Sequence, residues 1–249
     1  MKRTLAWRWF WWLLAAGVFV LIVFRGTWWE VVLSAIFPGQ TQVLYPTVSL
    51  SMLVVRHLEL VLISSALTLM VAIPLGVWVT RPSGRDFLGL SSAVASLGQT
   101  FPPVAVLALA VPVLGFGLWP AVFALFLYGL LPVVRNIIAG IQAVAPSTLD
   151  AARGVGMSSR QALFRVELPL AAPVIMAGVR TSVIINVGTA MVGAVVGSGG
   201  LGVPIVSGLV QSNTAFVLEG ALPAAGMALL LDQLLSNIEK SISPPATSL

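Results

Sequence analysis

Cysteine is absent from the 249-residue sequence, so neither a disulfide nor a thiolate-bound metal can form. Histidine occurs once, as His57, which excludes a metal cluster built from several histidines. Charge is scarce as well, because Asp, Glu, Lys and Arg make up only 8% of the residues, against about a quarter in a soluble domain. The polar surface is therefore too small to cover a water-soluble globule, and most of the chain is expected to face lipid.

Apolar residues make up 58% of the sequence, and its mean hydropathy is +1.03. A helix needs about 20 apolar residues to cross a bilayer. Six stretches meet or approach this length, so the predicted fold is an all-α polytopic membrane protein with about six transmembrane helices. The stretches are Trp9–Phe24, Leu58–Val79, Phe87–Leu114, Pro120–Ala139, Pro173–Val196 and Phe216–Leu235.

The third stretch is interrupted by Pro102-Pro103. Proline removes a backbone donor and clashes with the preceding turn of a helix. Too few residues remain on either side of the pair for two separate crossings. We therefore predict a kink within one span.

Basic residues gather in alternate gaps between the spans, or near the span ends beside those gaps as Arg135 does, which sets the predicted orientation. One side receives Lys2, Arg3, Arg8, Arg81, Arg85, Arg135, Arg153, Arg160, Arg165 and Lys240, and the other receives Arg25 and Arg56. The positive-inside rule then places both termini and residues 150–169 in the cytoplasm. The formal net charge of +5 is explained by this bias, so no nucleic-acid partner is expected.

The predicted organisation has three parts. Residues 1–56 hold a transmembrane helix and an external loop, Arg25–Arg56. Residues 57–238 form the transmembrane core, and residues 239–249 form a cytoplasmic tail. The apolar stretch near the N-terminus lacks a small-residue cleavage site, so it is expected to stay in the protein as a membrane span.

Residues 150–169 are unusual because five of the chain's few charges lie within these twenty positions, between apolar stretches. Ser147 is a candidate cap for a first short helix, and Asp150 suits the positive end of that helix. Gly154 and Gly156 are expected to stop it. A second short helix is predicted from Ser158-Ser159 through Leu168, ended by Pro169. On pattern alone, the segment could instead rest on lipid headgroups.

The same segment resembles the cytoplasmic signature of membrane subunits of ATP-binding-cassette (ABC) importers. That signature reads acidic-Ala-Ala, three residues, Gly, nine residues, aliphatic, any residue, Leu-Pro. The matching residues here are Asp150, Ala151, Ala152, Gly156, Val166, Leu168 and Pro169. Asp stands for the usual Glu and Val for the usual Ile. The resemblance implies a type I ABC importer permease fold, with residues 147–169 as a coupling loop that docks on an ATPase subunit.

Further strings resemble the permeases of osmoprotectant importers, which carry glycine betaine, choline, carnitine and similar quaternary amines. They lie at residues 98–112, 127–141, 177–188, 196–202 and 219–235. The resemblance implies a non-catalytic, cofactor-free subunit in a bacterial inner membrane. The implied partners are ATPase subunits, a second permease chain and an external substrate-binding protein. An amino-acid or methionine permease is the neighbouring alternative, because the coupling loop is shared.

The glycine-rich stretch Gly197–Gly202 does not fit a phosphate-binding loop, since no lysine follows it and no strand precedes it. Ser198 would need a facing histidine to act as an intramembrane protease, and His57 is the only one. Glycines also permit a non-helical turn at membrane depth. Pathway lining or gating is therefore the favoured role of this stretch, especially Gly199, Gly200 and Gly202, with helix packing as the alternative.

Four further residues are candidates for lining the translocation pathway beside the proline break: Gln99, Thr100, Pro102 and Pro103. A broken helix leaves carbonyl groups free to line a cavity. Asn186 is a fifth candidate.

Charged residues within or near spans are costly, and they are usually paired or functional. Glu59 and Glu219 begin their spans and are expected at headgroup level. Arg180 can either extend to the interface or pair within the bundle. Asp232 is expected to be a structural partner; as a proton-relay group it would instead indicate an ion-coupled secondary carrier.

Overall fold

The computed structural model describes residues 2–242 and contains no strand in this part of the chain. The helices are α1 (Lys2–Phe24), α2 (Gly26–Ile36), α3 (Leu50–Val79), α4 (Leu88–Thr100), α5 (Pro103–Leu114), α6 (Leu118–Gln142), α7 (Pro146–Gly154), α8 (Ser159–Ala162), α9 (Leu168–Thr189), α10 (Gly202–Gln211) and α11 (Thr214–Ile242). Three short turns, η1 (Arg85–Phe87), η2 (Leu163–Glu167) and η3 (Ala190–Val196), extend α4, α8 and α9. Of the predicted tail 239–249, residues 243–249 lie outside the described part.

Five helical segments are long and apolar enough to cross a membrane, and a bent pair supplies the sixth crossing. The bent pair joins Arg85–Thr100 to Pro103–Leu114 at 97°. The prediction of about six spans is confirmed. The predicted kink at Pro102-Pro103 is in fact a turn of nearly a right angle. The cause is local: Phe101 before the proline pair takes an extended conformation, as residues before proline do, and Pro102 adds a second extended residue.

The predicted external loop Arg25–Arg56 was too long. Residues 26–36 form α2, and α3 begins at Leu50, so the irregular segment shrinks to residues 37–49. Ser49 starts α3 by accepting a hydrogen bond from the Met52 N–H at 3.4 Å. The boundary drawn between residues 56 and 57 therefore falls inside α3.

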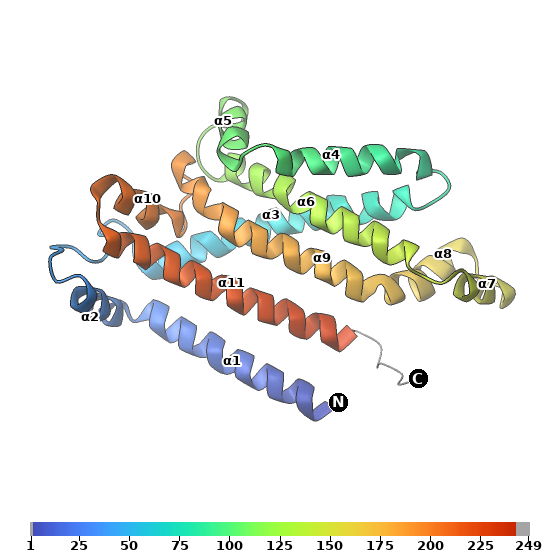
Figure 1. Ribbon diagram of the computed structural model, residues 1–249, viewed down its shortest axis with the longest axis horizontal. Coiled ribbons are helices and arrows are strands. Elements are labelled where there is room, and N and C mark those ends of the chain that lie inside the picture. Colours follow the sequence, from blue (N-terminus) through green and yellow to red (C-terminus); the bar gives the residue numbers. More distant parts are fainter. Residues whose placement is uncertain (1, 243–249) are drawn as a thin grey trace.

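Figure 1 shows α1, α3, α6, α9 and α11 running side by side along the long axis of the molecule. One end carries α7 and α8 and is called the α7/α8 end below. The opposite end carries α2 and α10. The start of α1 and the end of α11 both point toward the α7/α8 end, which is the arrangement that an even number of crossings requires.

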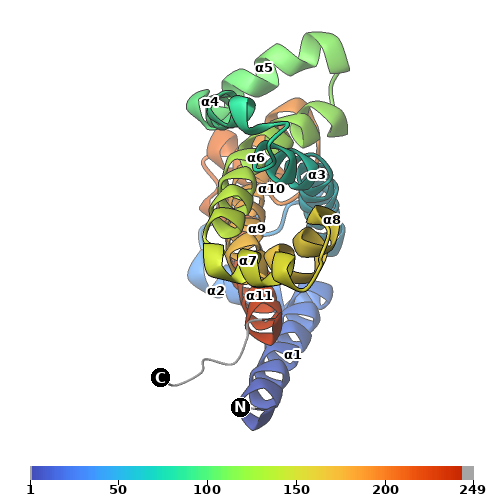
Figure 2. The same ribbon diagram turned by 90° about the vertical axis from the view of Figure 1, so that its right-hand side faces the viewer.

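Helix α6 forms the centre of the bundle. In its most apolar stretch 61% of the residues are buried, against 6% in α1. Two apolar clusters meet on α6: one around Leu125 also holds residues of α3, α5 and α9, and one around Ile137 holds residues of α3, α4 and α9. Viewed from the α7/α8 end, α4 and α5 lie on one side of this core and α1 lies on the other (Figure 2).

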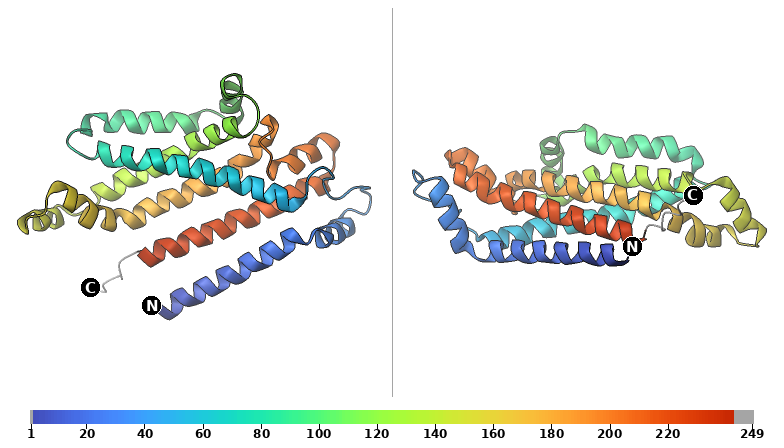
Figure 3. Two further views of the ribbon diagram at one scale, coloured as in Figure 1. Left: turned by 180° about the vertical axis from the view of Figure 1, so that it is seen from behind. Right: turned by 60° about the horizontal axis from the view of Figure 1, so that its bottom comes forward.

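Helix α1 is an outer element that lies along α11 (Figure 3). Arg8 donates to Asn237 Oδ1 at 3.0 Å and to Ser236 Oγ at 3.3 Å. The Trp12 indole donates to the Leu230 carbonyl at 2.8 Å. Polar bonds therefore hold α1 to α11, and its apolar residues are left mostly exposed, as expected of a helix that faces lipid.

Candidate functional site: the two-helix turn and the broken span

The two-helix turn consists of α7, α8 and η2, and Glu167 at the end of η2 is its base. The middle of the turn is built as the sequence predicts. Gly156 has φ +82°, and the Met157 N–H donates to Ala152 O at 3.1 Å while the Gly156 N–H donates to Arg153 O at 2.9 Å. These two bonds form a Schellman motif, which needs a left-handed residue where Gly156 stands. The predicted stop after Gly154 is confirmed.

Ser158 then starts α8. Its hydroxyl accepts from the Gln161 N–H at 3.3 Å, and the Gln161 side chain accepts from the Ser158 N–H at 2.8 Å. This reciprocal capping box confirms the predicted cap.

Three details at the edges of the turn differ from prediction. Ala145 stands at the cap position of α7, and Ser147 makes no capping bond. Asp150 lies beyond the first turn of α7 and pairs with Arg153 at 3.1 Å. Pro169 does not end the second helix: η2 is a π-helical turn that leads straight into α9, where proline is tolerated because first-turn N–H groups need no helical partner.

The signature residues differ in exposure. Asp150, Ala151, Gly156 and Pro169 are exposed, Val166 and Leu168 are half-buried, and Ala152 is buried. Two apolar side chains, Val155 and Phe164, are 75% and 67% exposed on the same turn. An apolar surface that projects from the end of the bundle is suited to contact with another protein.

One contact of this turn was missed by the sequence reasoning. Glu167 occupies the variable position of the signature, yet its side chain is only 8% exposed and pairs with Arg81 at the end of α3. Arg81 Nη1 donates to Glu167 Oε1 at 2.9 Å, and Arg81 Nη2 donates to Oε2 at 2.5 Å. The base of the turn is therefore fixed to α3 by a two-point ion pair. Sequence spacing alone gives no signal for a pair that is 86 positions apart.

At the broken span, Gln99 and Thr100 end α4, and Pro102 and Pro103 begin α5. Gln99 donates to the Tyr128 carbonyl of α6 at 2.8 Å, and the Tyr128 hydroxyl donates to the Phe101 carbonyl. Tyr128 of α6 therefore holds the break by two hydrogen bonds, one accepted by its carbonyl and one donated by its hydroxyl. Thr100 and Pro102 remain exposed, and Thr100 bonds only within α4, to the Ser96 carbonyl at 3.0 Å.

The glycine-rich stretch forms the predicted non-helical turn between η3 and α10, because Gly197, Gly199 and Gly200 all have φ near +80°. Gly200 packs against His57 of α3, where a Cβ would come 3.1 Å from the imidazole Nδ1. Gly202 lies against the Met191 backbone. The structure thus places this turn in contact with α3, and its proposed gating role stays a prediction.

His57 is fully buried and serves this packing. Its Nε2 lies 3.0 Å from the Val187 carbonyl, and its Nδ1 accepts from the Leu201 N–H at 3.3 Å. Ser198 Oγ is buried and has no hydrogen-bond partner within residues 2–242. Both ring nitrogens are therefore engaged with backbone, which gives no support to a serine–histidine pair.

Asn186 is also fully buried, on a different side of α6 from Gln99. Its amide donates to Ser64 Oγ and Ser65 Oγ of α3, both at 3.3 Å. Gly129 of α6 provides the space, since a Cβ there would come 3.3 Å from the Asn186 amide. Such bonds between membrane helices contribute about 1 kcal/mol each. The contacts are those of a packing residue, and the pathway role predicted for Asn186 stays untested.

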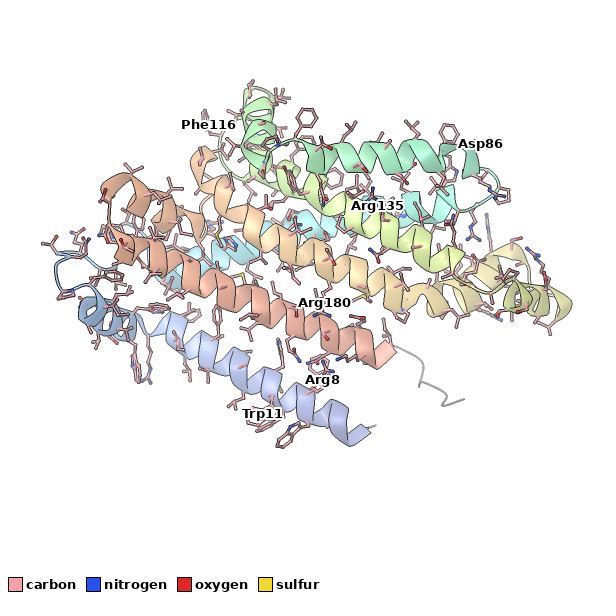
Figure 4. All side chains as sticks on the ribbon, viewed as in Figure 1. Arg8, Trp11, Asp86, Phe116, Arg135 and Arg180 are labelled. Atoms are coloured by element: carbon pink, nitrogen blue, oxygen red, sulfur yellow. The ribbon has the colours of Figure 1, made fainter. Side chains whose placement is uncertain are left out.

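The charges within the spans are mostly paired. Arg180 of α9 binds both carboxylate oxygens of Asp232 on α11, at 2.6 and 2.7 Å, and Glu239 lies 3.6 Å away (Figure 4). Asp232 is thus paired as expected of a structural partner, and Arg180 is paired within the bundle. Glu59 pairs with Arg56 at 2.8 Å.

Glu219 is covered by protein and not by lipid headgroups or water, and the headgroup depth expected for it stays a prediction. This side chain is 1% exposed, and its Oε2 accepts from the Tyr45 N–H at 2.7 Å. Segment 37–49 folds back over the start of α11 and covers it.

Five helices long enough to cross a membrane, a sixth span that is broken and an exposed two-helix turn at one end are the features of a multi-pass membrane transport subunit. Residues 72–244 match the family described as "Binding-protein-dependent transport system inner membrane component". The chain belongs to this family.

Curated relatives cover most of the chain. It is 42% identical over 189 residues to the "Osmoprotectant import permease protein OsmY" of Salmonella typhimurium, covering 76% of this chain and 80% of that protein. It is 40% identical to the "Choline transport system permease protein OpuBB" of Bacillus subtilis, covering 76% and 86%. It is 42% identical to the "Carnitine transport permease protein OpuCD" of Listeria monocytogenes, covering 70% and 78%.

Among solved structures, the chain resembles one titled "Inward facing conformations of the MetNI methionine ABC transporter". The TM-score is 0.70 at 21% identity, covering 78% of this chain and 95% of that one. It also resembles a "Crystal structure of an amino acid ABC transporter with histidines", with a TM-score of 0.61 at 22% identity, covering 76% and 92%. At these identities the likeness shows the fold, which confirms the predicted type I importer permease fold.

Proposed function

We propose that this chain is the permease subunit of an ATP-driven importer for quaternary-amine osmoprotectants. The observation that carries this proposal is the 42% identity, over about three quarters of the chain, to relatives named for osmoprotectant and carnitine transport. The solved structures named for methionine and an amino acid share only about a fifth of their residues with it. Quaternary amines are therefore the better supported substrate class.

In this proposal α7 and α8 dock into a partner ATPase, which hydrolyses ATP. The turn is braced by the Gly156 motif and the Ser158 cap, and it presents the exposed side chains of Val155 and Phe164. Its base is held to α3 by Arg81 and Glu167. Movement of the ATPase would thus be transmitted to α3 and α9 together. The chain itself contributes different contacts in the inward-facing and outward-facing states.

The proposed orientation places the α7/α8 end and both termini in the cytoplasm, with α2 and α10 on the external side of a bacterial inner membrane. The distribution of arginine supports it: Arg85, Arg153, Arg160 and Arg165 all lie at the α7/α8 end, while Arg25 and Arg56 lie toward the opposite end. An external substrate-binding protein would deliver substrate at the end that carries α2 and α10. A second permease chain, identical or paralogous, would complete the pathway.

The proposed pathway follows the broken span. Irregular backbone is tolerated at membrane depth only where it is buried in protein or lines a water-filled cavity. Thr100, Phe101 and Pro102 are exposed, so they are not buried in this chain. Their irregular backbone must therefore face a water-filled cavity or another protein chain, and not lipid. We therefore assign this side of α4 and α6 to the pathway or to contact with the second chain, and keep Gly199, Gly200 and Gly202 as a candidate gate.

The proposal is tested by reconstituting the chain in liposomes with its partner ATPase, the second permease chain and the binding protein. ATP-dependent uptake of radiolabelled glycine betaine, carnitine and choline is compared with that of methionine and histidine. We expect uptake of at least one quaternary amine and of neither amino acid. Uptake of methionine or histidine alone would overturn the substrate class, and uptake without ATP would overturn the proposed mechanism.

A further inference from the structure

Helix α4 has two unlike sides. Its large apolar residues Leu90, Val94 and Leu97 are 53–60% exposed and follow one another at helical spacing on the side suited to lipid. Ser92, Ser96 and Thr100 follow one another at intervals of four on the other side. The Ser96 hydroxyl donates to the Ser92 carbonyl at 2.8 Å, and Thr100 repeats the pattern with Ser96. We call these three residues, together with Arg135 of α6, the polar strip.

Arg135 is exposed on α6 and lies toward α4 (Figure 4). Its Nη2 donates to Ser96 Oγ at 3.2 Å, and this is its only hydrogen bond among the residues that the structure describes. A guanidinium carries five N–H donors, so most of its capacity is unused.

The other arginines within spans are better satisfied. Arg180 has Asp232, Arg56 has Glu59, and Arg8 has two side-chain acceptors on α11. Within residues 2–242, Arg135 has no carboxylate at ion-pair distance. An unpaired cation in a transmembrane helix is costly beside lipid and usually faces water or a ligand.

Extension to the membrane surface does not explain this side chain. Arg135 lies seven residues before the end of α6, roughly 10 Å from it, and its partner Ser96 lies eight residues into α4, roughly 12 Å from the start of that helix. The guanidinium is therefore held at the depth of Ser96, one helical turn from Thr100 and the proline break. It sits beside the proposed pathway, on its cytoplasmic side.

We propose that Arg135, positioned by Ser96, binds the carboxylate of a zwitterionic quaternary amine as it passes toward the cytoplasm, and so favours betaine-like over choline-like substrates. The inference rests on the proposed function. Glycine betaine and carnitine carry a carboxylate that the planar guanidinium can bind at two points. Choline carries only a hydroxyl beside its positive charge, so Arg135 repels it without a compensating bond.

The first test compares uptake of glycine betaine, carnitine and choline by the complete transporter carrying Arg135→Gln, Arg135→Lys or Arg85→Gln. Arg85 is an exposed arginine at the α7/α8 end outside the polar strip, so it controls for loss of positive charge. With Arg135→Gln we expect KM for glycine betaine and carnitine to rise about tenfold, as for the loss of one charge-assisted hydrogen bond. KM for choline should not rise and should fall modestly, because a repelling charge is removed. Arg135→Lys should retain part of the preference, and Arg85→Gln should behave as wild type.

The second test uses the absence of cysteine. Arg135→Cys and Ser96→Cys should react with an anionic, membrane-impermeant methanethiosulfonate, whereas Leu97→Cys on the apolar side of α4 should not. Unreactive thiols at both strip positions would overturn the inference, because the strip would then not face water.

The outcomes separate the inference from the function on which it rests. A wild-type transporter that takes up none of the three amines overturns the proposed substrate class and the inference with it. A wild-type transporter that is active, but in which Arg135→Gln lowers choline and glycine betaine uptake equally or changes neither, overturns the inference alone.

Discussion

Arg81 at the end of α3 binds both carboxylate oxygens of Glu167, in the π-helical turn between α8 and α9. The pair joins the base of the two-helix turn to a central helix of the bundle. Because a π-helical turn is less stable than a regular one, this turn needs such support from neighbouring elements.

Replacing Glu167 tests whether this pair holds the turn in place. Glu167→Ala leaves a half-buried arginine without its partner, and we expect a loss of unfolding free energy on the order of 3 kcal/mol. Asp150→Ala is the matched control, because its pair with Arg153 is about 70% exposed on both sides and contributes about 0–1 kcal/mol. Thermal unfolding in detergent measures both. Equal losses in the two variants would show that the Arg81 pair has no special structural role.

The backbone of the turn can be tested with two neighbouring glycines. A Cβ at Gly154 or at Gly156 would meet no atom within 4 Å, but only Gly156 has positive φ, at +82°. Gly156→Ala should therefore cost about 1–2 kcal/mol through backbone strain, whereas Gly154→Ala should be neutral or slightly stabilising.

If the turn docks on the ATPase, Gly156→Val should insert normally yet lose co-purification of the ATPase and ATP-driven uptake. Arg153→Ala should have a milder effect. Retained docking in Gly156→Val together with lost docking in Arg153→Ala would show that the turn is recognised by charge and not by shape.

Orientation can be measured because the chain has no cysteine of its own. Ser147→Cys at the start of α7 should react with an impermeant maleimide only when the cytoplasmic side is opened. Gln211→Cys at the end of α10 should react in intact cells. Both residues are exposed, so poor access does not complicate the result. The reverse pattern at either position would contradict the six-crossing topology.

Local patterns allowed much of this fold to be predicted from the sequence. The spans follow from apolar length, and Gly156 and Ser158 follow from short-range capping rules that depend on neighbouring residues only. The proline pair correctly located the break, where the extended residues Phe101 and Pro102 turn the chain. The size of the bend, 97°, was not predicted, because the bond from Tyr128 of α6 to Phe101 also helps to hold it.

Contacts between distant residues could not be predicted in this way. Glu219 is buried because segment 37–49 folds over it. Its hydrogen-bond partner in that segment, Tyr45, is 174 positions away in the sequence. Glu167 was overlooked because its partner Arg81 lies on another helix. The serine spacing on α4 was a visible signal for the polar strip, but only the packing of α6 against α4 shows that Arg135 joins it.

The ion pair of Arg180 and Asp232 predicts an asymmetry between single variants. Arg180→Gln leaves two carboxylates, Asp232 and Glu239, near one another, whereas Asp232→Asn leaves Arg180 close to Glu239. We expect Arg180→Gln to be the more destabilising, on the order of 2 kcal/mol, and the double variant to recover part of this loss.

Thermal unfolding of the single and double variants measures that coupling. Uptake by a well-folded Asp232→Asn variant should continue in the presence of a protonophore, since ATP drives transport in the proposed mechanism. Loss of uptake at unchanged stability would instead point to a proton-relay role for Asp232, as in a secondary carrier.

The last prediction concerns the proline break. Replacing Pro102 and Pro103 together by alanine restores two N–H donors and allows α4 to continue as a regular helix beyond Thr100. Straightening would move Phe101 away from the Tyr128 hydroxyl and would turn α5 out of its position across α6. We expect the double variant to insert at wild-type levels and to lose at least nine-tenths of its uptake. Pro112→Ala is the control, because Pro112 lies within α5 near its far end, away from the bend.

Substrate-stimulated ATP hydrolysis shows why uptake is lost in the double variant. If the break forms part of the pathway, hydrolysis should persist while uptake is lost. Unchanged uptake in the double variant would show that the bend serves packing alone and that the pathway lies elsewhere.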